Sequence, residues 1–387
     1  MNQGERERVI AVERFRSGEA AATICATLGR SRAWLYKWVG RSRDGGEDWF
    51  KTRSRCPCRT RRMAAEVEDR VEIIRLSRYN RGLSCGPQAI LWDLDDLGVS
   101  PRPSERTIAR ILSRRSLTHQ RTGAYEPKGK AYPAWPANAP GDVHQADFVG
   151  PCYLKGPVRF YSLNCMDAAS RRCAIHPIVG RASDLVISVI WESWWKLGLP
   201  GVLQLDNELA FFGSRRHPHG MGALIRLCLL HGVEPCFIPV REPWRNGIIE
   251  RFNRTWVHGF FRRTEMAGWE ALRSESASFE RRWNAEHRHS GLRGRTPLQF
   301  LADHGTALEY PPQRDLPSLP LPKPKTGRYH FIRFIRSNRR LDIFGESFLM
   351  PIEATYEYVR ATVDVAKQKL RVYLGDEFLH AFDYRLR

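Results

Sequence analysis

The chain has no hydrophobic run long enough to cross a bilayer, and residues 1–6 lack the apolar core of a secretory signal. Membrane and secreted proteins are therefore not expected. Its nine cysteines are odd in number and show no repeating spacing, which argues against a disulfide scaffold and predicts a reducing, cytoplasmic compartment. No histidine precedes His119, and the close pair Cys56 and Cys58 has no second pair near it, so no zinc site is expected.

Acidic residues are few relative to basic ones, because 42 Asp and Glu stand against 62 Lys and Arg and leave a net charge of +20. Such an excess attracts polyanions over long distances, so the expected partner is nucleic acid. Hydrophobic residues make up 42% of the 387 positions. This share is enough to build folded cores, and the length predicts two or three domains.

Residues 1–50 have the helical pattern of a small DNA-binding domain. Two short helices are separated by Gly29, and Ser31 can cap the second of them. This pair predicts a helix-turn-helix whose second helix enters the major groove, with an ordinary three-helix bundle as the alternative. Its candidate DNA contacts are Arg30, Arg32, Lys37 and Arg41. The densest basic run follows at 51–62, a solvated linker or a segment lying along phosphates through Arg59, Arg61 and Arg62.

Residues 64–118 repeat this pattern and predict a second helix-turn-helix domain. Ser104 is a good helix cap, and the apolar residues Ile108 and Ile111 after it face inward. Arginines at four-residue spacing form one stripe on the same helix, namely Arg106, Arg110 and Arg114. Two tandem units make DNA binding a stronger prediction than either unit alone.

The pattern changes after a linker rich in proline and glycine at 119–140. From 141 to 305 strands alternate with helices, which predicts an α/β core with a mixed sheet and flanking helices. A Pro-rich stretch follows, and 325–387 then contains short segments that alternate with period two. These segments predict a small β-barrel as a separate C-terminal module.

Three acidic residues of the α/β core are candidates for catalysis. Asp147 lies within the first predicted strand, Asp206 ends a later strand, and Glu250 lies in the helix that follows Pro243. Carboxylates placed in this way can converge on two divalent metals about 3.5–4 Å apart, the arrangement used for in-line phosphoryl transfer. Oxygen ligands favour Mg²⁺, with Mn²⁺ as a substitute, over zinc. Taken singly, each has an ordinary alternative, such as capping a turn, ending a strand or, for Glu250, pairing with Arg254.

Longer strings surround these acids. Asp206 is followed by Asn, Glu250 belongs to a Pro-x-x-Asn-Gly-x-x-Glu-Arg string at 243–251, and an Asn-x-x-x-x-His-Ser-x-Leu-x-Gly-x-Thr-Pro string runs from 284 to 297. A further stretch, Asp-Ala-Ala-Ser-Arg, occupies 167–171. With these motifs the chain resembles the DDE transposases of bacterial insertion sequences that have a retroviral-integrase-like core, in the insertion-sequence-481-like branch. The resemblance covers nearly the whole chain.

The resemblance implies an RNase H-like core with a mixed five-stranded sheet and flanking helices, preceded by all-α helix-turn-helix domains. It also implies that Asp147, Asp206 and Glu250 hold two Mg²⁺ ions. The expected activity is 3′-end cleavage at the terminal inverted repeats of an element, followed by strand transfer into target DNA. The enzyme would act on double-stranded DNA as a dimer or higher homo-oligomer, in the bacterial cytoplasm at the nucleoid. Basic residues beside the glutamate add three candidate DNA contacts, Arg245, Arg251 and Arg254.

Two other functions are compatible with the sequence. A repurposed transposase could serve as a DNA-binding regulator without catalysis, and a metal-dependent nuclease could cut DNA without joining it. Some positions also depart from the usual family pattern. Glu208 stands where glycine is common, Arg288 stands where proline is common, and the interval from Asp206 to Glu250 is long because of a polar loop at 213–220. None of these departures removes a predicted metal ligand.

Overall fold

The structure is a computed structural model that describes residues 1–52, 62–118, 132–155, 158–213 and 219–386. Contacts between Cα atoms divide the chain into two compact units, Met1–Met63 and Ala64–Arg387, and each unit is considered by itself. Within the described ranges, no helix combines the length and the apolar composition that a bilayer-spanning segment needs.

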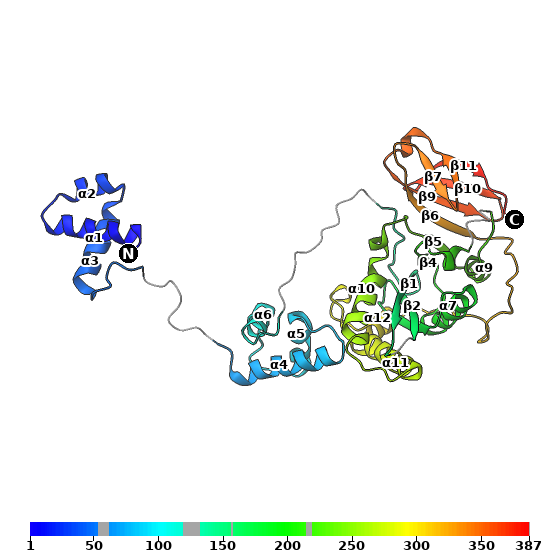
Figure 1. Ribbon diagram of the computed structural model, residues 1–387, viewed down its shortest axis with the longest axis horizontal. Helices are drawn as coiled ribbons and strands as arrows, with labels where there is room; N and C mark the ends of the chain where they lie inside the picture. The colour runs from blue at the N-terminus through cyan, green and yellow to red at the C-terminus, as the bar shows by residue number, and fades with distance from the viewer. Residues whose placement is uncertain (53–61, 119–131, 156–157, 214–218, 387) are drawn as a thin grey trace. The chain divides into compact units, whose positions relative to one another are not determined.

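Three helices form the first unit: α1 (Gln3–Arg16), α2 (Ala21–Leu28) and α3 (Arg32–Asp44) (Figure 1). The turn between α2 and α3 is tight because Gly29 adopts a left-handed conformation with φ 62°. Ser31 then caps α3 by accepting a hydrogen bond from the backbone of Trp34. The predicted pair of helices with a Gly turn is therefore present, and its assignment as a DNA-binding helix-turn-helix remains a prediction.

The second unit begins with a further set of three helices: α4 (Ala65–Asn80), α5 (Pro87–Asp96) and α6 (Glu105–Arg114). Apolar residues at helical spacing bury their side chains between these helices, as the amphipathic pattern of the sequence predicts. Arg78 of α4 is buried and donates to Asp93 of α5 from Nε at 2.6 Å. The ion pair supplies the charge partner that a buried guanidinium requires.

A mixed sheet forms the centre of the second unit. Its five core strands are β1 (Val143–Tyr153), β2 (Arg159–Asp167), β3 (Cys173–Ile178), β4 (Val202–Leu205) and β5 (Glu234–Phe237). They lie in the order β3-β2-β1-β4-β5, with β1, β2 and β3 antiparallel and with β4 and β5 parallel to β1. The predicted five-stranded mixed sheet is therefore confirmed.

Helices cover both faces of this sheet (Figure 1). One face packs against α7 (Ser183–Leu197), α8 (Leu209–Phe212) and α9 (Ala223–Leu230). The other packs against α10 (Gly247–Thr255), the π-helical segment η2 (Trp256–Phe261) and α11 (Trp269–Glu286). Successive strand residues alternate between these two cores, because side chains of a strand point to opposite faces of the sheet. The 3₁₀ turn η1 (Pro243–Asn246) leads into α10, and α12 (Pro297–His304) follows α11 after a second 3₁₀ turn, η3 (Ser290–Leu292).

The end of the predicted linker also belongs to this core. Residues 119–131 lie outside the described residues, but Tyr132, Trp135 and Ala137 pack against a small cluster that contains Val143 and Val202. Residues 132–137 therefore cover part of the sheet, because aromatic side chains within the Pro-rich segment gain apolar contact there.

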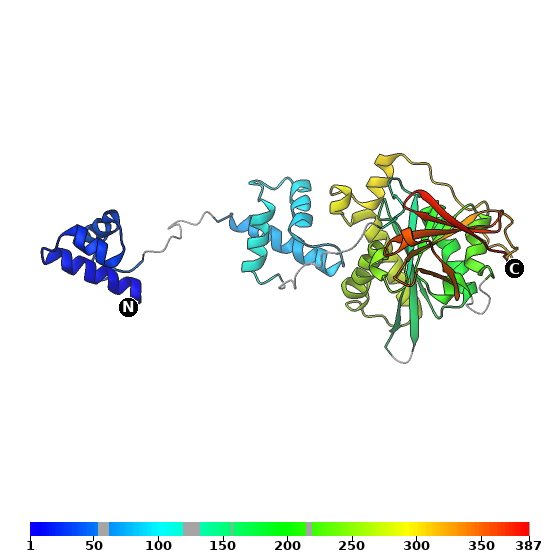
Figure 2. The ribbon, with the colours of Figure 1, turned by 90° about the horizontal axis from the view of Figure 1, so that it is seen from above.

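The C-terminal strands correct the prediction of a separate small β-barrel. β6 (Arg328–Phe334), β9 (Tyr358–Asp364), β10 (Lys369–Leu374) and β11 (Glu377–Asp383) extend the central sheet to nine strands. Figure 2 shows these orange to red strands against the green ones of the core. The hairpin of β7 (Arg340–Ile343) and β8 (Glu346–Leu349) forms a sheet of its own, and the 3₁₀ turn η4 (Ile352–Ala354) follows it.

The junction between the two parts of the sheet is the parallel pairing of β5 with β6. Cys236 lies opposite His330 and Phe237 lies opposite Phe331. The ring of Phe331 is fully buried and stacks on that of Phe237, with centroids 5.3 Å apart. Without β6 the apolar strand β5 would leave an open edge, so this pairing removes a site of aggregation and merges two cores into one.

Replacing Phe331 with alanine is expected to lower the free energy of unfolding of this unit by about 3–5 kcal/mol, because a buried ring is lost from a shared core. Urea denaturation followed by circular dichroism measures the change, and the exposed Phe378 of β11, replaced in the same way, is the control. Because the sheet is continuous, the lost stability should lower the urea midpoint of a single unfolding transition of the whole unit. A separate early transition of the C-terminal strands, with the core midpoint unchanged, would contradict the merged core.

Candidate active site

The strand pairing brings Asp147 and Asp206 to the same level of the sheet. β1 and β4 are parallel neighbours in which Val143 lies opposite Val202 and Gln145 lies opposite Gln204. Continuing this register places residue 147 beside residue 206, on the same face as 145 and 204 because strand side chains alternate. The two aspartates therefore lie next to each other where β4 ends.

Three amide side chains hold α10 on β1, and with it Glu250. Gln145 Oε1 accepts a hydrogen bond from the backbone N of Ile249 at 3.0 Å. Asn246 Nδ2 donates to the carbonyl of Ala146 at 3.3 Å, and Asn253 Nδ2 donates to Asp147 Oδ2 at 2.9 Å. Since Asn253 lies three residues after Glu250 on the helix, this last bond brings the glutamate to the same region as Asp147.

A buried chain of polar side chains fixes Asn253 in turn. Ser162 Oγ donates to Asn164 Oδ1 at 2.7 Å, and Asn164 Nδ2 donates to Asn253 Oδ1 at 2.8 Å. Both β2 residues are fully buried. Because each member has a partner, the network stabilises one orientation of the Asn253 amide, with its nitrogen toward Asp147.

The charges of Asp206 and Glu250 act on Asp147. Burial raises the pKa of Asp147 to about 7, and the charges of Asp206 and Glu250 add to this rise while the bond from Asn253 opposes it. Burial raises the pKa of Asp206 to about 6, with the charge of Glu208 adding to it. Burial likewise raises the pKa of Glu250, against the charge of Arg254. Closely placed carboxylates raise one another's pKa in this way, and a cation between them would lower it again.

The donor set consists of carboxylate oxygens, which suits Mg²⁺ or Mn²⁺. Within the described residues, however, no group of three or more His, Cys, Asp or Glu side chains is close enough together to hold a metal ion. The acids are therefore neighbours but do not form a complete set of ligands in this conformation. Glu208, the extra acid of the sequence, is turned to Arg181, whose Nη1 donates to its Oε2 at 2.7 Å.

A buried arginine from the C-terminal strands supports the segment after Asp206, and sequence reasoning did not find it. Arg333 of β6 donates from Nη2 to Asn207 Oδ1 at 2.7 Å and from Nη1 to the carbonyl of Ile238 at 3.0 Å. Asn207 Nδ2 also donates to Ile238 O, at 2.6 Å. Burial lowers the pKa of Arg333 to about 10, which leaves it charged at neutral pH. It therefore fixes the residue that follows Asp206 to the ends of β5 and β6.

A second contact from the C-terminal strands reaches the segment before Glu250. The Tyr358 hydroxyl donates to Glu242 Oε1 at 2.8 Å, and Arg245 Nε donates to Glu242 Oε2 at 3.0 Å. The Arg245 guanidinium also lies over the rings of Tyr132 and Tyr358, 4.1 and 5.0 Å from their centroids. Arg245, a predicted DNA contact, is thus held inside the protein.

The other predicted DNA contacts differ in their surroundings. In the first unit, Arg32 and Lys37 are exposed on α3, whereas Arg30 pairs with Glu7 at 2.8 Å. The Arg41 guanidinium lies over the ring of Trp38, 4.8 Å from its centroid. Arg59 and Arg61 lie outside the described residues, and Arg62 is exposed.

In the second unit, Arg106 and Arg110 are exposed on α6, and Arg114 forms an ion pair with Glu68 of α4. Arg251 and Arg254 are exposed on α10, directly beside Glu250. The α6 stripe and these two α10 residues therefore leave four arginines accessible to a polyanion, while Arg114 has an acidic partner already.

One family model matches part of the α/β core. Residues 231–297 match a family model described as Integrase core domain. With the strand order β3-β2-β1-β4-β5 and helices on both faces, this match makes the core an integrase-type fold of the RNase H-like class. No curated protein matches the chain.

Two solved structures illustrate what the chain is similar to. One is the HTLV-2 integrase catalytic core domain in complex with magnesium, with 16% identity and a TM-score of 0.34 over 43% of this chain and 99% of that one. The other is the simian T-cell lymphotropic virus intasome in complex with PP2A regulatory subunit B56 gamma. It has 15% identity and a TM-score of 0.37 over 82% of this chain and 97% of that one.

In EDTA, the change Asp147→Asn is expected to stabilise the protein at pH 8 by roughly 1–3 kcal/mol. The pKa of Asp147 is raised from 3.8 to about 7 on folding, so the folded state binds this proton more tightly than the unfolded state does. Its contribution to stability is therefore lost as the pH rises from about 4 to 7. Urea denaturation at pH 5 and pH 8 measures the effect, with the exposed Asp376 changed to Asn as control. If the variant is no more stable than the wild type at pH 8, burial and the neighbouring acids do not destabilise the ionised Asp147 carboxylate.

Proposed function

We propose that the protein is a DNA transposase that cleaves the 3′ ends of its element and joins them to target DNA. The observation that carries the proposal is the position of Asp147 on β1, near enough to Asp206 after β4 and to Glu250 on α10 that the charges of both raise its pKa. Residues 231–297 of the same core match the integrase family model. The net charge of +20 and two sets of small helices with exposed arginines support binding of double-stranded DNA.

Asp147, Asp206 and Glu250 are the residues that would hold two Mg²⁺ ions, which Mn²⁺ could replace. When bound, such ions supply Lewis-acid stabilisation of charge on the phosphate and lower the pKa of an attacking water. Asn253 would keep Asp147 oriented, because its amide donates to one carboxylate oxygen. Arg333 and Asn207 would hold the segment after Asp206 in place. A small movement of the three carboxylates, without refolding, would then complete the set of metal ligands.

The proposed reaction has two steps of the same kind. Water attacks the phosphorus of a phosphodiester at the element end, and the P–O bond to the element's terminal 3′ oxygen breaks. This step releases a 3′-hydroxyl on the element and leaves a 5′-phosphate on the flanking strand. That hydroxyl then attacks a phosphodiester of the target, forming one P–O bond as another breaks, with no covalent enzyme intermediate. Because two ends must be joined to one target, we propose a dimer or higher homo-oligomer on DNA, in the bacterial cytoplasm at the nucleoid.

The assay incubates the full-length protein with labelled DNA carrying the inverted repeats that flank its gene, a target plasmid and Mg²⁺. Joined product supports the transposase, nicks alone indicate a nuclease, and DNA retention without reaction indicates a regulator. The helical units are tested separately by gel shift, where Arg106→Gln and Arg32→Gln should each weaken binding to the repeats.

The change Asp206→Asn is expected to abolish joining while leaving end binding within about twofold of the wild type, since it removes one anionic oxygen and changes the side-chain volume little. Gel shift in EDTA and the joining assay in Mg²⁺ measure the two properties. Asp303→Asn, at an exposed position on α12, is the control. Unchanged joining by the Asp206 variant would exclude the proposed ligand set.

Changing Arg333 to Lys is expected to raise the Mg²⁺ concentration for half-maximal joining by at least about threefold, because a lysine ammonium cannot bridge Asn207 and the Ile238 carbonyl as the guanidinium fork does. A Mg²⁺ titration of joining measures this change, which general loss of folded protein would not produce. The exposed Arg336, also changed to Lys, is the control. An unchanged Mg²⁺ requirement would show that the Arg333 contact does not position Asp206.

A further inference from the structure

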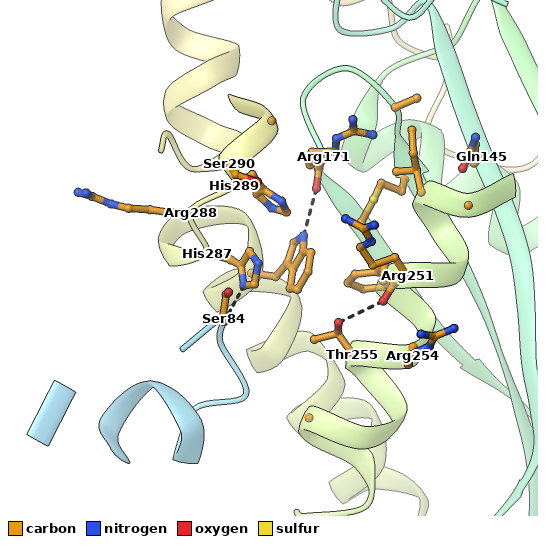
Figure 3. Close-up of a pocket in the computed structure, with 18 of the residues that line it drawn as sticks. Ser84, Gln145, Arg171, Arg251, Arg254, Thr255, His287, Arg288, His289 and Ser290 are labelled. Atoms are coloured by element: carbon orange, nitrogen blue, oxygen red, sulfur yellow. Dashed lines mark hydrogen bonds between the residues drawn. The ribbon is translucent and has the colours of Figure 1, made fainter. Parts of the chain in front are cut away.

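Next to the acidic residues the second unit contains a large cavity that the proposed chemistry does not use (Figure 3). Its volume is about 1160 Å³, and it lies between α10, the end of α11 and the segment that joins α4 to α5. Seven arginines line it, and among the described lining residues there is no aspartate or glutamate. A cavity with this charge attracts anions, since its walls contain no carboxylate that could neutralise them.

Four of these arginines already have partners. Arg75 donates to the carbonyl of Leu117, and Arg263 lies over the ring of Tyr79 at 3.8 Å from its centroid. Arg245 is bound to Glu242, and Arg288 pairs with Asp96 at 2.5 Å. The other three are Arg171, Arg251 and Arg254, for which the described part of the chain offers no ion pair.

Arg171 is the member least explained by the needs of the fold. It follows β2 in a left-handed conformation with φ 64°, which an arginine adopts only at a cost. Its Nη1 is buried and has no hydrogen-bond partner among the described residues. The nearest acid, Asp167, already accepts hydrogen bonds from the backbone of Ser170 and Gly141 at 2.6 and 2.8 Å. Arg171 thus combines a strained backbone with a buried Nη1 that lacks a hydrogen-bond partner among the described residues.

The fold uses only the backbone of this residue. The carbonyl of Arg171 accepts a hydrogen bond from Trp283 Nε1 at 3.1 Å, drawn as a dashed line in Figure 3. Figure 3 also shows the Arg171 and Arg251 side chains from facing elements, the turn after β2 and helix α10. Burial lowers the pKa of Arg171, the charge of Asp167 opposes this change, and the charge of Arg251 adds to it. The guanidinium groups of Arg171 and Arg251 thus repel each other across the space.

The rest of the lining combines polar side chains with apolar and aromatic ones. Among the aromatic residues Trp244 is exposed, whereas Phe252 and Trp283 are buried, and His287 stacks on Trp283 with centroids 3.8 Å apart. Burial lowers the pKa of His287 well below its usual value, so this ring is neutral. A cationic pair beside flat, uncharged rings suits a nucleotide, which has a phosphate and a base, better than it suits a bare phosphate.

We propose that this cavity binds a segment of single-stranded DNA, with one phosphodiester between Arg171 and Arg251 and a base of the same segment against the exposed ring of Trp244. A cavity of about 1160 Å³ accommodates a few nucleotides of one strand but is too small for a B-form duplex. The inference rests on the proposed function, because the strand belongs to the DNA substrate. The strings at 167–171, 243–251 and 284–297, which the metal site leaves largely unused, each contribute to this cavity.

The test measures binding of a fluorescein-labelled thymidine trinucleotide to the full-length protein by fluorescence anisotropy in EDTA, so that catalysis plays no part. Arg171→Gly and Arg251→Gln are each expected to weaken binding by at least about tenfold, because each removes a charge-assisted contact. Arg273→Gln, at an exposed position on α11 outside the cavity, should bind within about twofold of the wild type.

Arg171→Gly also separates binding from folding. Because glycine adopts φ 64° readily and carries no unsatisfied guanidinium, this variant should melt at the wild-type temperature or above it, although it binds less well. A lower melting temperature, with binding lost in this variant and kept in Arg251→Gln, would make Arg171 a structural residue and overturn the proposal.

Two competition experiments complete the test. An abasic trinucleotide should compete at least about threefold less well than the thymidine one, and inorganic phosphate at equal concentration should compete hardly at all. Equal competition by inorganic phosphate, or unchanged binding by both arginine variants, would overturn the proposal. DNA joining without trinucleotide binding would refute only the proposed binding of single-stranded DNA in the cavity. Trinucleotide binding without DNA joining would refute only the proposed transposase activity.

Discussion

The attachment of α10 to β1 is the constraint on which the acidic site depends. Gln145, Asn246 and Asn253 make this attachment through neutral amides. An amide can satisfy a buried backbone group or one oxygen of a carboxylate without bringing a positive charge. An arginine or lysine at position 253 would pair with Asp147 and remove the negative charge that a metal ion needs. The helix is therefore fixed in place while the acids remain unneutralised.

The continuous sheet gives the C-terminal strands a part in this site. Asp206 and Glu250 belong to segments that begin at the ends of β4 and β5, where a short strand gives little support. Arg333 bonds to the first segment, and Tyr358, through Glu242, bonds to the second. Because β6 and β9 are hydrogen-bonded neighbours in the sheet, both contacts come from one rigid element. The C-terminal strands thus act on the arrangement of the acids as well as closing the open edge of β5.

The sequence predicts the local elements well but not their partners. The succession of strands and helices in 141–305 predicts the α/β core correctly, and the apolar alternation in 325–387 predicts strands there. The same alternation in 325–387 cannot tell a closed barrel from strands added to an existing sheet, because both bury one face of each strand. Hence the β5–β6 junction was not predicted. Arg333 was missed for the same reason, since an arginine in an alternating strand usually faces solvent.

For the candidate site, too, the sequence predicts the local positions of residues better than it predicts their partners. The order of Asp147, Asp206 and Glu250 on strand, strand end and helix is readable from the sequence, and the pairing of β1 with β4 brings the two aspartates together. What sequence could not give is which basic residues are already engaged. Arg245 stands three residues after Glu242, a spacing that signals an ion pair, yet a basic run beside a catalytic acid equally predicts a DNA contact. The structure shows Tyr132 and Tyr358 beside the guanidinium in addition to Glu242, and the DNA contact of Arg245 stays a prediction.

Groups of opposite charge lie on two faces of α10, and neither is satisfied by the protein alone. Glu250 and Asn253 lie toward Asp147, whereas Arg251 lines the cavity with Arg171, whose Nη1 has no partner among the described residues. Both the raised pKa of Asp147 and the strained, unpartnered Arg171 cost stability that a simpler core would not lose. A divalent cation on one face and a phosphodiester on the other would remove these costs together. A DNA strand bound along α10 together with its metal ions would supply both groups. The stability that the crowded Asp147 and the strained Arg171 cost the free protein would then be regained as free energy of binding to that strand.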